Sequence, residues 1–232
     1  TAGNPGVAAG SASGDNWYLV FGNGPESINA TLPNAQSGSF FVYDLNSLSF
    51  VPGWTPRVLN DAPNSFVGDP VVVDWDLNFK ADAIYFGSIG GSASAPNGKL
   101  FKIDLGDDVG RNPADWTDPI VLVDPQRPII STPAVTFDES GNRWVFAGTG
   151  RFFSEADKLS EAPQTLFGVI DSPAQETPLD PVNRYNALIN TTDARIATSG
   201  FVEGVGAGDI TNESELMTAA LDAGGWRLNL PL

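Results

Sequence analysis

Histidine and cysteine are both missing from this chain of 232 residues. Without histidine there is no Ser-His-Asp triad, no histidine general base and no histidine metal ligand. Without cysteine there is no disulfide bond, no thiolate nucleophile, no zinc ribbon and no iron–sulfur cluster. The two absences therefore exclude several large classes of enzyme and of metal site.

Positive charge is also scarce, with 12 Lys and Arg residues against 28 Asp and Glu residues. The net charge of −16 would repel the phosphate backbone of DNA or RNA, so we expect no nucleic-acid partner. No apolar run approaches the ~20 residues of a membrane span, so we expect no such span. The first residues include no start Met, no basic region and no apolar run, so we expect no signal peptide.

The composition favours a globular protein built from strands and turns. Hydrophobic residues make up 41% of the chain and aromatic residues 10%, which is typical of proteins with a core. The length is ample for one domain and marginal for two. Asp outnumbers Glu by 20 to 8, and there are 25 Gly and 18 Pro. Because Asp, Gly and Pro favour turns, whereas helix surfaces favour Glu, we expect an all-β fold.

The chain contains an internal repeat. Its most recognisable part is an aromatic or apolar strand ending in Phe-Gly or Phe-Ala-Gly, then a polar loop and a second strand ending in Asp. The first strands are at 17–24, 83–90 and 144–150, and the second strands are at 39–44, 99–104 and 165–171. Further apolar strands precede two units, at 69–74 and 132–137, and follow two units, at 119–123 and 54–59. The glycine of the first strand, at Gly22, Gly87 and Gly148, recurs about every 60 residues.

Four short strands recurring at this period predict the blades of a β-propeller, each a four-stranded antiparallel sheet. The blades would cover about 14–60, 65–124 and 129–172. The alternative is a β-sandwich whose hairpins resemble one another by chance. Because a propeller closes with roughly 4–8 blades, we expect residues 1–232 to form an incomplete propeller domain of a longer polypeptide.

The repeat pattern breaks down in the segment 173–224. We expect an irregular excursion here that holds a hairpin and one short helix near the C-terminus, followed by a last strand. The hairpin strands are expected at 185–189 and 194–198, the helix at 211–221 and the last strand at 225–231. Thr211 or Asn212 can cap the helix, and Gly224 can end it.

The sharpest local signal is the loop Asp-Trp-Asp-Leu-Asn-Phe-Lys-Ala-Asp at 74–82. Oxygen-bearing side chains occupy its first, third, fifth and ninth positions, and its seventh position offers a backbone carbonyl. This spacing curls a loop around a hard cation, so we expect a Ca²⁺ site. The ligands would be Asp74, Asp76, Asn78, the carbonyl of Lys80, and Asp82.

The loop departs from an EF-hand loop at two positions. Phe79 replaces the Gly of position six, and Tyr85 replaces the bidentate Glu of position twelve. The alternative to a calcium site is an acidic, solvated turn that binds no metal. Asp107 and Asp108 are interpreted as part of another turn. Nothing in the sequence pairs two carboxylates for glycoside hydrolysis, and we expect no catalytic activity.

Two segments of the third repeat resemble a known family. They are Phe-Ala-Gly-Thr-Gly-Arg-Phe-Phe at 146–153 and Gln-Thr-Leu-Phe-Gly-Val-Ile-Asp at 164–171. Both resemble the C-terminal β-propeller of PilY1/PilC-type proteins, the tip-associated adhesins of type IV pili. The segments 17–24, 72–105 and 225–231 resemble further motifs of that propeller in the same order. The resemblance spans roughly residues 14–231.

The resemblance implies a quinoprotein-like propeller without catalytic activity, in a pilus biogenesis factor that controls extension and retraction and mediates surface attachment. It also implies calcium at the loop 74–82. The implied partners are the remainder of the polypeptide, with its missing blades and N-terminal adhesive region, the minor pilins of the pilus tip, and a host or abiotic surface. The implied location is extracellular, at the pilus tip or on the bacterial surface in association with the outer membrane.

Two other functions fit parts of the sequence. A structural, calcium-dependent surface-layer protein would also be acidic and rich in β-structure. An enzyme on a quinone-type propeller would need a cofactor funnel, a carboxylate base and usually a disulfide bond or histidine nearby. Because this chain has neither Cys nor His, the enzyme is the less favoured of the two.

Overall fold

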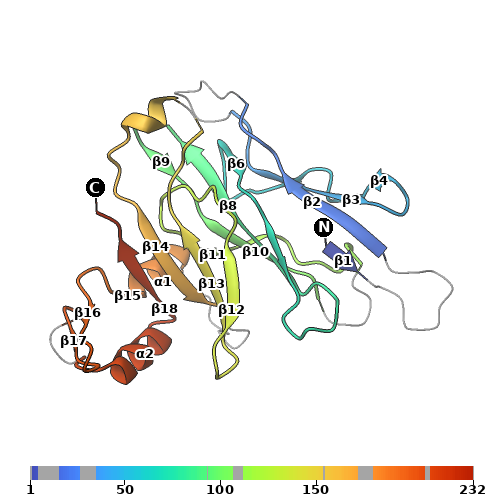
Figure 1. Cartoon of the computed structure of the whole chain (residues 1–232). Coiled ribbons are helices and arrows are strands. Elements are labelled where there is room, and N and C mark those ends of the chain that lie inside the picture. The colour runs from blue at the N-terminus through green and yellow to red at the C-terminus, as the bar shows by residue number, and fades with distance from the viewer. Residues whose placement is uncertain are drawn as a thin grey trace.

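The computed structural model describes residues 2–4, 16–26, 35–92, 94–106, 112–153, 155–171, 180–206 and 210–231. In this part of the chain the protein is mostly β-sheet, with several antiparallel sheets and two short α-helices (Figure 1). The β-rich class expected from the composition is therefore confirmed. Among the described residues there are two α-helices where the sequence predicted one, and no sheet closes on itself.

The first sheet is formed by the N-terminal repeat. Its strands lie in the order β1-β2-β3-β4, and β5 also pairs with β3. They are β1 (Ala2–Asn4), β2 (Asn16–Gly22), β3 (Ser39–Asp44), β4 (Ser49–Phe50) and β5 (Arg57–Val58). In β2 the exposed Trp17 and Leu19 alternate with the buried Tyr18 and Val20. This alternation is typical of a strand with one covered face.

The second sheet is built around β8. On one side β8 pairs with β10, and on the other it pairs with β6 and β7 in succession. The strands are β6 (Ser65–Val67), β7 (Val71–Val73), β8 (Ala83–Gly91), β9 (Pro96–Asn97), β10 (Leu100–Asp104) and β11 (Ile120–Val123). Residues 83–90 of β8 are all buried, so both faces of this sheet are covered.

The third sheet combines the last repeat with the C-terminal strand. Its order is β12-β13-β14-β18-β15, and β15 is parallel to β18. The strands are β12 (Ala134–Phe137), β13 (Arg143–Gly148), β14 (Thr165–Ile170), β15 (Ile189–Asn190) and β18 (Gly225–Asn229). A short 3₁₀ helix, η1 (Glu155–Leu159), lies between β13 and β14. The first and second strands predicted for each repeat, and the last strand, are all present.

The three sheets pack on one another with the second sheet in the middle (Figure 1). One buried cluster joins the first and second sheets, with Phe40 of β3 against Phe86 of β8. The other joins the second and third sheets and includes Leu100 of β10 and Phe167 of β14. Burying each such side chain stabilises the fold by about 1.5–3 kcal/mol. This packing on both faces explains why β8 lacks the alternation of exposed and buried residues seen in β2.

The hairpin predicted at 185–189 and 194–198 is wrong. Tyr185 lies in the helix α1 (Pro181–Ala187), because Asp180 accepts hydrogen bonds from the first-turn N–H groups and Pro181 suits the first helical position. β15 then pairs with β18, whereas β16 (Arg195–Ile196) pairs with β17 (Val202–Glu203). Residues 173–179 and 207–209 of the predicted excursion lie outside the described residues.

The helix predicted at 211–221 is confirmed as α2 (Glu213–Asp222). The side chain of Asn212 caps it by accepting a hydrogen bond from the N–H of Glu215. The helix stops before Gly224, whose φ of 70° suits glycine. Ala220 of α2 packs against the outer face of the third sheet.

Candidate metal centre

The loop 74–82 connects β7 to β8, two strands that pair directly with each other. The N–H of Asp82 donates a 2.7 Å hydrogen bond to the carbonyl of Val73, so the two ends of the loop are joined. This closure brings Asp74, Asp76 and Asp82 together. One carboxylate oxygen from each lies within 4.8 Å of the other two. In the described part of the chain, this is the one group of three acidic side chains so close together.

Hydrogen bonds inside the loop hold the other two predicted ligands in the same turn. Asp74 accepts a 2.7 Å bond from the N–H of Phe79 and a 3.2 Å bond from the N–H of Asn78. The Asn78 amide donates to Asp76 at 2.7 Å, and its oxygen accepts the N–H of Lys80 at 2.9 Å. The five predicted ligand residues therefore belong to one continuous, internally bonded turn.

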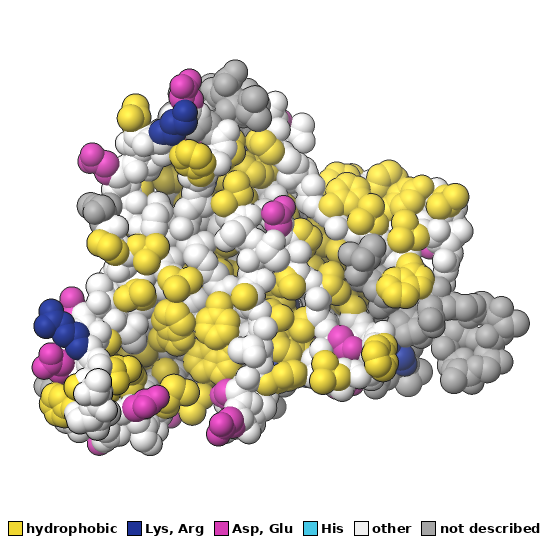
Figure 2. Space-filling view, in the orientation of Figure 1, with side chains coloured by type: hydrophobic (Ala, Val, Ile, Leu, Met, Phe, Trp, Pro, Cys, Tyr) yellow, Lys and Arg dark blue, Asp and Glu magenta, His cyan; other side chains and the backbone are white. Residues whose placement is uncertain are grey.

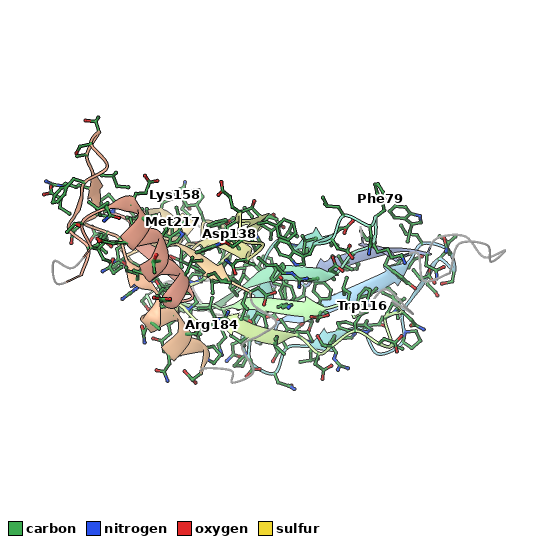
Figure 3. All side chains as sticks on the ribbon, turned by 90° about the horizontal axis from the view of Figure 1, so that it is seen from below. Phe79, Trp116, Asp138, Lys158, Arg184 and Met217 are labelled. Carbon is green, nitrogen blue, oxygen red and sulfur yellow. The ribbon has the colours of Figure 1, made fainter. Side chains whose placement is uncertain are left out.

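Two bulky residues in this loop adopt left-handed backbone conformations. Leu77 has φ of 58° and Phe79 has φ of 67°. For a side chain with a Cβ, this conformation costs roughly 1–2 kcal/mol. Phe79 stands where an EF-hand loop has glycine, and it adopts the conformation that glycine would adopt there. Its side chain is 92% exposed and projects away from the sheets (Figure 3).

Trp75 anchors the loop, a role that the sequence analysis did not identify. Its backbone N–H donates to the carboxylate of Asp82, and its ring is buried. The ring meets Phe137 of β12 edge to face at 5.0 Å, and the guanidinium of Arg143 lies 5.6 Å from its centre. The sequence offered one signal for this role, namely that the aromatic residue Trp75 lies between the acidic residues Asp74 and Asp76. The loop is thus attached to the third sheet as well as to the second.

A buried polar network lies behind Trp75. The indole N–H of Trp75 donates to the Tyr85 hydroxyl at 3.3 Å, and this hydroxyl donates to Asp171 at 2.5 Å. Asp171 also forms a 2.8 Å ion pair with Lys102 of β10. Burial, together with the negative charge of Asp171, raises the pKa of Tyr85 well above its usual value. The phenol therefore stays protonated and links the second sheet to the end of β14.

Arg184 of α1 completes the connection between these two sheets (Figure 3). Its guanidinium donates to the carbonyl of Leu122 at 3.2 Å and to the carbonyl of Ile170 at 2.5 Å. Burial lowers the pKa of Arg184, while the charge of Asp171 acts in the opposite direction. The sequence analysis did not identify Arg184, because its contacts form with segments that are distant in the sequence.

The size and composition of the acidic group would allow it to hold a divalent cation such as calcium. Calcium binds oxygen at about 2.3–2.6 Å, so two ligands on opposite sides of the ion are separated by about 4.6–5.2 Å, and oxygens closer together than this can share one ion. Asp74 and Asp82 are half-buried and Asp76 is exposed, which leaves solvent access to the group. Carboxylates, an amide and a carbonyl are the oxygen ligands that calcium prefers. Asp107 and Asp108, interpreted from the sequence as a turn, lie outside the described residues.

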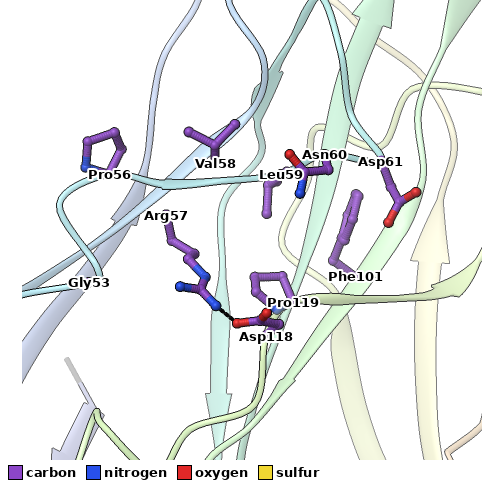
Figure 4. A pocket seen from close by; sticks show the side chains of 10 residues that line it. All are labelled: Gly53, Pro56, Arg57, Val58, Leu59, Asn60, Asp61, Phe101, Asp118 and Pro119. Carbon is purple, nitrogen blue, oxygen red and sulfur yellow. Dashed lines mark ion pairs between the residues drawn. The ribbon is translucent and has the colours of Figure 1, made fainter.

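A separate cavity of about 500 Å³ lies where β5 approaches the segment before β11 (Figure 4). Its ionisable lining residues are Arg57, Asp61 and Asp118. Arg57 and Asp118 point toward each other and form an ion pair. The cation of this cavity is thus already neutralised, and the cavity does not gather carboxylates as the loop 74–82 does.

No protein-family model, no curated protein and no solved structure matches this chain. No helix among the described residues is long and apolar enough to cross a membrane. The resemblance to PilY1/PilC-type propellers therefore rests on the sequence motifs themselves, and the interpretation of the loop rests on its own geometry.

Proposed function

We propose that this chain is a calcium-binding, non-catalytic part of a β-propeller in a type IV pilus tip adhesin and biogenesis factor of the PilY1/PilC type. The observation that carries the calcium assignment is the convergence of Asp74, Asp76 and Asp82 at a β7–β8 turn. The pilus assignment comes from the motifs at 146–153 and 164–171. Calcium is the regulatory ligand in this proposal, and it acts on pilus extension and retraction.

The sheet topology supports the propeller interpretation. Each of the three sheets contains four antiparallel strands in sequence order, as a propeller blade does. These paths are β1-β2-β3-β4, β7-β8-β10-β11 and β12-β13-β14-β18. In the third path the last strand comes from beyond the excursion that contains α1 and α2. Face-to-face packing of the sheets is also how neighbouring blades bury their apolar faces.

The electrostatics of the loop explain why a cation would bind. The three carboxylates carry like charges at short distance, in a chain whose net charge is −16. N–H groups of Trp75, Asn78 and Phe79 partly balance them. A divalent cation would offset two of the three negative charges, and water would complete its six to eight oxygen ligands. The closed form of the loop is then favoured by mass action.

In this proposal the domain acts outside the cell, at the pilus tip or on the bacterial surface. Its partners are the remainder of the polypeptide, the minor pilins, and the host or abiotic surface to which the pilus attaches. A calcium-dependent surface-layer protein is the second candidate, favoured by the acidic composition and the same loop. The genomic neighbourhood separates the two, because minor pilin genes support the first and repeated surface-layer domains the second.

Titration calorimetry tests the calcium site directly. We expect the wild-type chain to bind one calcium ion, and we expect Asp82→Ala to lose most of this binding. Asp138→Ala is the matched control, because Asp138 also accepts backbone N–H bonds in a tight turn but is not part of the acidic group. If the wild-type chain takes up no calcium at millimolar concentration, the loop is only an acidic turn and the proposal fails.

A further inference from the structure

The first sheet exposes an apolar face on the side away from the second sheet. This outer aromatic face consists of Trp17, Leu19, Phe21, Phe41, Tyr43 and Phe50. Trp17 is 50% exposed, Leu19 41% and Phe50 45%. The rings are in mutual contact, since Phe21 and Phe41 stack at 5.3 Å and Phe50 meets Tyr43 at 5.2 Å. Figure 2 shows hydrophobic side chains gathered over β3 and β4. Contiguous apolar surface of this kind marks an interaction site.

The same cross-strand aromatic pair occurs in the second sheet, where it is buried. Phe21 is directly opposite Phe41 in the β2–β3 register, and Phe86 is directly opposite Phe101 in the β8–β10 register. The ring centres are 5.3 Å and 5.5 Å apart, and the rings are nearly parallel in both pairs. Phe86 and Phe101 are almost completely buried, at 0% and 1% exposure. The two pairs differ in whether another sheet covers them.

The third sheet repeats the arrangement with Ala147 opposite Phe167. Both residues are buried in the cluster that joins the third sheet to the second. In the second and third sheets, the pair is covered by the sheet that comes before it in the chain. The first sheet covers the second by stacking Phe40 on Phe86 at 4.9 Å. The second sheet contributes Leu100, which occupies the same place in β10 as Phe40 does in β3, to the cluster around Phe167.

We propose that the outer aromatic face is covered by a further antiparallel sheet of the same polypeptide. The residue of that sheet equivalent to Phe40 is large and apolar, and it stacks on the pair formed by Phe21 and Phe41. The proposal rests on the blade interpretation above and does not require calcium. It continues an interface that the chain already forms twice.

A second copy of this chain is a poorer occupant. A copy that continued the stack head to tail would have to offer the outer face of its third sheet. That face already has α2 packed on it, with Ala220 in the same cluster as Trp144, Ile170 and Trp226. The helix α2 therefore occupies part of the face that a second copy would have to offer, and Leu166, which corresponds to Phe40 in the strand register, is only 38% exposed on that face.

Because the chain has no cysteine, one introduced thiol reports on one position. Leu19→Cys places a thiol on the outer aromatic face, and Ile196→Cys places a control on β16, where the native side chain is 56% exposed. Each variant is made in the 232-residue chain and in the full product of its gene, and the rate of maleimide labelling is measured. In the short chain both thiols react quickly. In the full product we expect Leu19→Cys to react about ten-fold or more slowly, with Ile196→Cys unchanged.

Equal labelling of Leu19→Cys in both proteins would overturn the proposal, as would a gene product with no further sheet-forming sequence. Protection that rises with the concentration of the short chain would identify a second copy instead. Protection that requires another added protein would identify a separate partner. Trp17→Cys repeats the test if Leu19→Cys does not fold. Calorimetry on the loop 74–82 is independent of this labelling, so failure of the calcium proposal and failure of this one are distinguishable.

Discussion

At the scale of single residues, the loop 74–82 shows how side chains can impose a turn that the backbone resists. Asp74 accepts two backbone N–H groups from across the loop, including that of Phe79. This bonding holds Phe79 in a left-handed conformation although its side chain has a Cβ and is 92% exposed. Local hydrogen bonds therefore outweigh an intrinsic cost of roughly 1–2 kcal/mol.

Replacing Phe79 with glycine should relieve this cost. Glycine adopts positive φ freely but loses more entropy on folding, so we expect Phe79→Gly to stabilise the chain by about 0.5–1 kcal/mol in urea unfolding. Phe152→Gly is the control, because Phe152 is also exposed, at 68%, and is not among the residues with positive φ. The control should be destabilised. If both variants lose stability equally, the left-handed conformation of Phe79 carries no such cost.

At the scale of elements, the same aromatic pair has a different energetic role in different sheets. Phe86 of β8 is fully buried between two sheets, whereas Phe21 of β2 lies on the outer aromatic face. Both precede a glycine and face an aromatic residue across the sheet. The two phenylalanines thus have the same neighbours within their sheets, and they differ in that a second sheet covers Phe86 but not Phe21.

This comparison predicts that replacing Phe86 or Phe21 with alanine in the 232-residue chain reduces the unfolding free energy by unequal amounts. Phe86→Ala leaves a cavity, and we expect it to cost about 3–5 kcal/mol of unfolding free energy. Phe21→Ala removes a partly solvated ring and should cost about 1 kcal/mol or less. Chemical denaturation of the two variants measures both values. Equal losses would show that Phe21 is already covered in the isolated chain, which would contradict the exposure of the first sheet.

At the scale of the whole molecule, the loop 74–82 is joined to two sheets and not only to its own hairpin. Trp75 contacts Phe137 of β12, and the network through Tyr85 and Asp171 reaches the end of β14. We therefore expect a cation bound in this loop to strengthen the contact between the second and third sheets. Binding should stabilise the folded chain as one unit.

Calcium should consequently raise the melting temperature. With free calcium about 100-fold above the dissociation constant, the gain is about 2.7 kcal/mol, which corresponds to roughly 5–10 °C for a domain of this size. Magnesium should have a smaller effect, because a long flexible loop is ill suited to its tight octahedron. Differential scanning calorimetry in the presence of calcium, magnesium or a chelator measures these changes in melting temperature. A rise that survives in Asp82→Ala would place the effect at another site.

The repeated strands, the capped helix α2 and the acidic loop could be predicted from the sequence because their signals are local. Alternating apolar residues define a strand, an Asn or Asp at the right position defines a cap, and oxygen-bearing residues at odd positions define the loop. The same local logic failed at α1, where the cap of Asp180 and Pro181 was overlooked and a strand was expected.

Only the tertiary structure decided which strands pair at a distance and which faces are covered. A strand pattern shows that one face is apolar, but it does not name the partner of that face. Tyr85 and Asp171, which are hydrogen-bonded to each other, are separated by 86 residues, so no spacing rule connects them. The sequence alone determined the strands of the repeats and the composition of the loop, because backbone preferences act between near neighbours. Trp75 as anchor and the uncovered outer aromatic face emerged only from the folded chain, because burial depends on which segments long-range packing brings together.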